Sequence, residues 1–126
     1  MEFWIFGNPD LPQDSTPIHL MPRLRAAFPE HTFVLKDPLD EWEPMPEHLR
    51  VIDTIVGLYD VNEYTDLEGF AQAPSVTMHD FDALSQLRFL QKLGKLKKIT
   101  LYGVPDTLTE DQAFSQLEMR LRQLSV

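Results

Sequence analysis

The sequence predicts an α/β fold: a three-layer sandwich with a mostly parallel central sheet of about five strands and helices on both faces. Apolar runs rich in β-branched and aromatic residues alternate along the chain with segments whose apolar residues recur every three or four positions. One run, residues 51–56, is almost continuously apolar, which is typical of a central strand covered on both faces. The 126 residues, 43% of them hydrophobic, are enough for one core, so a single domain over residues 1–126 is expected.

Each element follows from a local pattern. Gly7 and the prolines after it indicate a loop between the first strand and the first helix, and Pro22 predicts either a kink in that helix or a start near Met21. Thr109 and Gln112 form a capping-box pattern that opens the last helix. The expected elements are strands at 2–6, 31–35, 51–56, 61–65 (an edge strand) and 99–102 (ending in Gly103), helices within 15–28, at 80–93 (terminated by Gly94) and from 109 onward, and a proline-interrupted loop at 37–46.

Charge and composition exclude several functions. The formal net charge of −9 argues against a nucleic-acid partner, and the short basic run at 92–98 is interpreted as a solvated helix end. The chain has no cysteine, which excludes disulfides, thiolate metal sites and cysteine nucleophiles. Neither a membrane-spanning run nor a signal-peptide pattern is found. A cytoplasmic monomer without a membrane or nucleic-acid partner is expected.

Three residues from separate parts of the chain are candidate metal ligands. Asp14 precedes the first predicted helix, Asp53 interrupts the apolar strand, and His79 precedes the predicted helix at 80–93. The carboxyl ends of parallel strands lie along one edge of a sheet, so these side chains can converge there. Two carboxylates and an imidazole suit a divalent ion such as nickel, zinc or manganese. The alternative for Asp53 is a structural carboxylate that caps a neighbouring loop, and His19, His31 and His48 are interpreted as surface residues.

In these features, in order along nearly the whole chain, the sequence resembles the hydrogenase maturation proteases. The matching motifs are Gly7-Asn8 followed by Gln13-Asp14, Asp53 on a hydrophobic strand, His79 before a leucine-rich helix, and a strand ending in Gly103-Val-Pro105. The resemblance implies a metal-dependent endopeptidase that removes the C-terminal extension of a nickel-iron hydrogenase large-subunit precursor. It further implies that Asp14, Asp53 and His79 are the catalytic and metal-binding residues, and that they engage nickel shared with the substrate, or another divalent metal.

The chain also differs from the family pattern. Gln13 replaces the first of two loop acids, and Asp37-Pro38 replaces an Asp-Gly sequence after the second strand. The alternative function is therefore a non-catalytic, metal-dependent binding or checkpoint protein in hydrogenase assembly. A nucleotide-binding domain is a weaker alternative, because Gly7 alone is not a Gly-x-Gly-x-x-Gly motif.

A folded protein substrate needs a docking surface. The loop at 37–46 and the segment at 59–73, with Trp42 and Tyr64 as exposed aromatic residues, are the predicted docking surfaces, and ordinary loop packing is the alternative interpretation.

Overall fold

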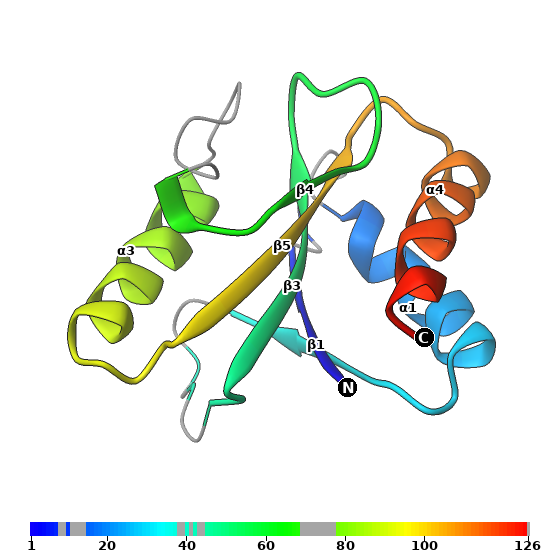
Figure 1. Ribbon diagram of the computed structural model, residues 1–126. Helices are drawn as coiled ribbons and strands as arrows, with labels where there is room; N and C mark the ends of the chain where they lie inside the picture. Colours follow the sequence, from blue (N-terminus) through cyan, green and yellow to red (C-terminus); the bar gives the residue numbers. More distant parts are fainter. Residues whose placement is uncertain are drawn as a thin grey trace.

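The computed structural model describes residues 1–7, 10, 15–37, 40, 42, 45–68 and 78–125, with only the backbone of residues 78–83 and 125 (Figure 1). Five strands form one sheet in the order β2-β1-β3-β5-β4. The elements in chain order are β1 (Glu2–Phe6), α1 (Thr16–Ala27), β2 (Thr32–Lys36), β3 (His48–Ile55), β4 (Asn62–Tyr64), α3 (Met78–Lys92), β5 (Lys98–Pro105), α4 (Glu110–Arg122) and the short 3-10 helix η2 (Gln123–Ser125).

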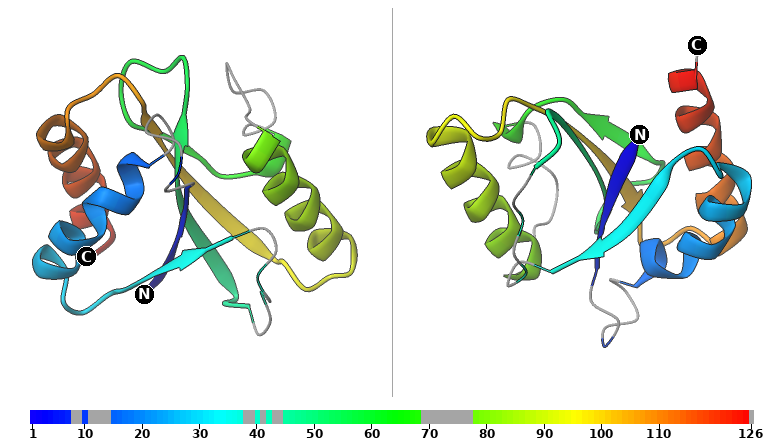
Figure 2. Two further views of the ribbon diagram at one scale, coloured as in Figure 1. Left: turned by 180° about the vertical axis from the view of Figure 1, so that it is seen from behind. Right: turned by 90° about the horizontal axis from the view of Figure 1, so that it is seen from below.

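The sheet is parallel except for one edge. β1 pairs in parallel with β2 and β3, β3 pairs in parallel with β5, and β4 runs antiparallel to β5. Helix α3 lies on one face of the sheet, and α1 and α4 lie side by side on the other (Figure 2). The predicted fold class is therefore confirmed, β3 is the central strand, and the short β4 is an edge strand as predicted.

Alternation of side chains along the strands builds two separate cores. Toward α3, Val51 and Ile55 of β3 belong to a buried cluster that includes Leu84, Leu87 and Leu90 of the helix. Toward α1 and α4, Ile52 belongs to a second cluster with apolar side chains of both helices. A strand that buries both faces must be apolar at almost every position, which explains the continuous run in β3.

Several boundaries differ from the sequence-based expectation, most clearly in β3, β5 and α1. β3 begins three residues earlier than predicted, at His48, and β5 continues through Gly103 to Pro105. The residues at these strand ends are polar or turn-forming, so their sequence does not indicate a strand. Their backbones nevertheless pair along the full β3–β5 ladder. Helix α1 runs from Thr16 to Ala27 across Pro22. Of the two alternatives predicted for Pro22, the start near Met21 is therefore wrong, and the kink stays a prediction.

The predicted capping box at the start of α4 and the predicted glycine terminator after α3 are both confirmed. The Thr109 hydroxyl accepts a hydrogen bond from the Gln112 amide at 3.1 Å, and the Gln112 side chain accepts one from the Thr109 amide at 3.0 Å. After α3, Gly94 has φ +77°, a left-handed conformation that favours glycine. These caps set where α4 begins and where the chain turns from α3 toward β5.

Candidate functional site

The carboxyl ends of the parallel strands meet at one edge of the sheet. Helix α3 and helix α4 begin at the end of the sheet where β3 and β5 finish, and the chain enters α1 after the carboxyl end of β1 (Figure 1). In open α/β sheets this edge is where ligands bind, because the connecting loops leave a crevice there. The three predicted site residues are therefore expected at this edge.

Asp53 lies near the carboxyl end of β3 and is completely buried. It faces α3, because it lies between Val51 and Ile55 at alternate positions and both belong to the α3-side cluster. Its Oδ1 accepts a hydrogen bond from the Thr54 amide at 2.8 Å. A carboxylate in this position is held in one orientation by the backbone of its own strand.

Gly103 of β5 lies directly beside Asp53, since the two residues are register partners across the ladder. A Cβ atom at Gly103 would lie 2.5 Å from Cδ1 of Ile55. The side chain of Ile55 therefore already fills the space next to this glycine, and glycine lets the two strands and this side chain pack closely. The sequence pattern treated Gly103 only as a strand terminator and missed this role beside Asp53.

The other two predicted ligands are less fully described. His79 is not before α3 but inside its first turn, because the helix begins at Met78; the structure gives its backbone alone. Asp14 lies outside the described residues, and its neighbour Ser15 is a buried residue directly before α1. The structure thus brings Asp53 and the α3 turn that carries His79 to the same face and the same end of the sheet.

The donor set fits a divalent metal in its chemistry. Asp53 supplies a buried, oriented carboxylate, and the predicted second carboxylate and imidazole would complete a set that nickel or zinc accepts. Within the described part of the chain, no group of three or more His, Asp or Glu side chains is close enough to hold a metal ion. Asp14 and the side chain of His79 lie outside the described part of the chain, so the three-residue site stays a prediction.

Two histidines differ from their predicted surface position. The His31 ring packs against Phe28 at 5.8 Å between centroids and against Phe3 at 5.4 Å, and its side chain is 6% exposed. The half-buried His48 Nε2 lies 2.7 Å from the Thr100 hydroxyl. Burial lowers the pKa of both imidazoles below 6.5. His19 is exposed, as predicted.

The predicted exposure of the docking aromatics is wrong. Trp42 is buried against Trp4 and Phe6, and its indole Nε1 donates a hydrogen bond to the Asp37 carbonyl at 2.9 Å. Tyr64 is half-buried and packs against the α3-side cluster. An aromatic side chain in a proline-rich loop gives no sequence signal that distinguishes packing inward from exposure. Tyr59, in the same predicted docking segment, is 88% exposed.

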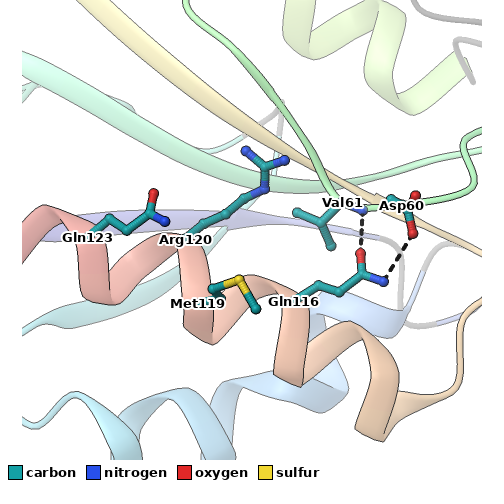
Figure 3. Close-up of a pocket in the computed structure, with 6 residues that line it drawn as sticks. All are labelled: Asp60, Val61, Gln116, Met119, Arg120 and Gln123. Atoms are coloured by element: carbon teal, nitrogen blue, oxygen red, sulfur yellow. Dashed lines mark hydrogen bonds between the residues drawn. The ribbon is translucent and has the colours of Figure 1, made fainter.

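A cavity of about 280 Å³ lies on the other face of the sheet, between the loop after β3 and helix α4 (Figure 3). Gln116 closes one side of it: its Oε1 accepts a hydrogen bond from the Val61 amide at 2.8 Å, and its Nε2 donates one to Asp60 at 3.2 Å. Arg120 lines the cavity and pairs with Glu63 at 3.5 Å. Because Asp53 faces α3, this cavity is separate from the predicted metal site.

The arrangement defines a three-layer α/β fold, and solved structures share it. The chain is similar to the hydrogenase maturating endopeptidase HybD from E. coli, at 20% identity over 98% of this chain and 93% of that one, with a TM-score of 0.62. It is similar to a hydrogenase 3 maturation protease, at 17% identity over 96% of this chain and 88% of that one, with a TM-score of 0.65. An uncharacterized protein from Wolinella succinogenes matches at 18% identity, 98% and 95% coverage and a TM-score of 0.67.

These likenesses establish the fold that the chain shares with the hydrogenase maturation endopeptidases. No protein-family model matches the chain. No curated protein sequence matches it either. Among the described residues, none of the helices has the length and apolar character needed to cross a membrane.

Proposed function

We propose that this protein is an endopeptidase that removes the C-terminal extension from the large-subunit precursor of a nickel-iron hydrogenase. The observation that carries the proposal is the complete burial of Asp53 at the carboxyl end of the central strand, within a fold that solved hydrogenase maturation endopeptidases share. A buried carboxylate is costly to desolvate, so its retention at a ligand-binding edge favours a functional role.

In this proposal Asp14, Asp53 and His79 bind nickel that the precursor brings to the reaction. The shared ion supplies Lewis-acid chemistry, polarising the scissile carbonyl or activating a water molecule. Asp53 contributes a fixed ligand, because the Thr54 amide holds its Oδ1. The chain has no cysteine to serve as a nucleophile, and its serines lack a Gly-x-Ser-x-Gly context.

The test is the mass of the precursor after incubation with the protein. Nickel-loaded and nickel-free precursors are compared, with the wild type and the Asp53→Asn and His79→Gln variants. We expect trimming of the nickel-loaded form only, and a loss of more than about tenfold in rate for each variant, since changes even to residues that support metal ligands cost about 10- to 100-fold.

Other outcomes separate the alternatives. Equal trimming of both precursors would exclude nickel recognition. A stable complex with the nickel-loaded precursor and no change in mass would instead favour the non-catalytic checkpoint, in agreement with the altered residues Gln13 and Pro38. Unchanged trimming by Asp53→Asn would show that the buried carboxylate is structural.

A further inference from the structure

The far end of α3 carries an unusual concentration of positive charge. Residues 88–98 hold five of the eleven Lys and Arg residues of the chain, while no Asp or Glu occurs between residues 83 and 105. All five basic residues are exposed: Arg88, Lys92, Lys95, Lys97 and Lys98. Because the whole chain has a net charge of −9, this segment is a positive patch on a strongly acidic protein.

Two large apolar side chains lie within this patch. Phe89 is 61% exposed and Leu93 is 53% exposed. Phe89 lies in the last turn of α3 and Leu93 directly follows the helix. The Leu93 amide donates a hydrogen bond to the Phe89 carbonyl at 3.1 Å, so the two residues are neighbours on this surface. They lie opposite the stripe of Leu84, Leu87 and Leu90, which packs on the sheet. We define the basic-apolar patch as Arg88, Phe89, Lys92, Leu93, Lys95, Lys97 and Lys98.

The ion pair that Arg88 of the basic-apolar patch forms within the fold is a weak one. Arg88 lies 3.7 Å from Glu68, and both side chains are largely exposed, at 49% and 80%, so the pair is weak. Cations near the carboxyl end of a helix interact favourably with the helix dipole, which explains why one or two of the five basic residues lie there. It does not account for Lys97 and Lys98 beyond the helix, nor for the exposed Phe89 and Leu93.

The position of the patch relative to the candidate site limits its role. Helix α3 runs from the carboxyl edge of the sheet, where β5 finishes, to the opposite end, where β5 begins (Figure 1). A helix of 15 residues is about 22 Å long. A partner bound at the patch therefore leaves the carboxyl edge open, and one folded protein can reach both places.

We infer that the basic-apolar patch binds an acidic surface, with apolar side chains at its centre, on the body of the same precursor whose extension is cleaved at the carboxyl edge; this inference rests on the proposed function. An acidic partner is repelled by the rest of the chain and attracted by this face, so the patch orients the encounter. Docking at a second point raises the local concentration of the extension at the site.

A protein partner fits the patch better than a membrane or a nucleic acid. A helix that inserts into a membrane needs a broad apolar face, whereas the broad face of α3 is already buried against the sheet. Binding to nucleic acid is opposed by the net charge of −9. A basic rim around Phe89 and Leu93 has the composition of a protein interface, with an apolar centre and a polar border.

The experiment measures binding and cleavage of purified nickel-loaded precursor. The apolar variant Phe89→Ser/Leu93→Ser has the matched control Met119→Ser, since Met119 on α4 is 66% exposed. The charge variant Lys92→Gln/Lys97→Gln has the control Ala26→Glu/Ser115→Glu, which changes the net charge equally at exposed positions on α1 and α4. Circular dichroism checks that every variant is folded.

We expect both patch variants to raise Kd and KM for the precursor about tenfold or more, with kcat at saturation unchanged. Both controls should stay within about twofold, the range of ordinary surface substitutions. The salt dependence of KM should become shallower in the charge variant. Patch variants that bind and cleave like their controls would overturn the inference.

The same experiment separates this inference from the proposed function. Patch-dependent binding of the precursor without cleavage by the wild type would support the docking surface and overturn the peptidase. Cleavage by the wild type, with patch variants that bind the precursor as the wild type does, would support the peptidase and overturn the docking surface. A wild type that neither binds nor cleaves the precursor would overturn both. Patch-dependent binding to phosphatidylcholine vesicles that contain phosphatidylglycerol, with unaffected precursor binding, would replace the protein partner by a membrane surface.

Discussion

At the scale of single residues, the strands place polar groups in positions that hydrophobic burial alone does not favour. Asp53 was found from the sequence because a carboxylate within a continuous apolar run is unusual. Its orientation toward α3 depends on how β3 is placed in the sheet, so only the structure shows toward which face of the sheet the carboxylate points. Convergence with Asp14 and His79 depends on loop and side-chain placement, which no local sequence pattern encodes.

The buried hydroxyl of Tyr102 leads to a prediction about the free energy of unfolding. It is completely buried, and no described residue gives its hydroxyl a hydrogen bond. Burial first, and then the nearby Glu63, raise its pKa to about 12. A Tyr102→Phe change removes a buried hydroxyl that has no hydrogen-bond partner among the described residues, so we expect an unfolding free energy that is unchanged or up to about 1 kcal/mol higher at pH 7.

The pH dependence of the same variant adds a second readout. The folded pKa of Tyr102 is above the unfolded value of 10, so stability is fully present below pH 10 and is lost as pH rises toward 12. Tyr102→Phe should lose this alkaline sensitivity, whereas the control Tyr64→Phe should keep it. Urea denaturation measures both. A loss of more than about 1 kcal/mol at pH 7 would mean that the hydroxyl stabilises the fold.

At the scale of elements, periodicity and caps predict the existence of strands and helices better than their ends. The β3 and β5 cores were predicted, but their outer residues were not, because His48 and Gly103 lack strand propensity and gain their hydrogen bonds from the neighbouring strand. Tertiary packing also outweighs the helix-breaking tendency of Pro22. Leu20, Met21 and Leu24 of α1 are buried on the sheet, and this packing stabilises a helix that passes through the proline.

The capping box of α4 gives the element-scale prediction. Thr109→Ala removes the hydroxyl that accepts from the Gln112 amide, so we expect a loss of about 1 kcal/mol in unfolding free energy. Thr109→Ser keeps this acceptor and should stay within about 0.5 kcal/mol of the wild type. Urea denaturation compares the two. Equal losses would show that the Thr109 methyl group, rather than the cap, contributes the stability.

At the scale of the whole molecule, two half-buried histidines couple folding to pH. Burial lowers the folded pKa of His31 and His48 below the unfolded value of 6.5. The folded state then binds protons less tightly than the unfolded state. The contribution of these residues is present above pH 6.5 and is lost as pH falls through 6.5 toward the folded pKa values.

We therefore expect the unfolding free energy to fall between pH 7.5 and 5.5, by at most about 1.4 kcal/mol per pH unit for each histidine. The His31→Gln/His48→Gln variant should show a shallower slope, while His19→Gln, at an exposed position, should keep the slope of the wild type. Denaturation curves across this pH range provide the measurement. Identical slopes in all three proteins would contradict the role of burial.

The proposed function depends on a metal site formed by Asp14, Asp53 and His79 at the carboxyl edge of the sheet. The most direct test is calorimetric titration of the purified protein with nickel and zinc. We predict saturable binding by the wild type that weakens below neutral pH, because an imidazole ligand must be deprotonated. Asp53→Asn and His79→Gln should each lower the affinity about tenfold or more, whereas Glu47→Gln and His19→Gln, both at exposed positions, should not. Equal metal affinity in all four variants would contradict the claim.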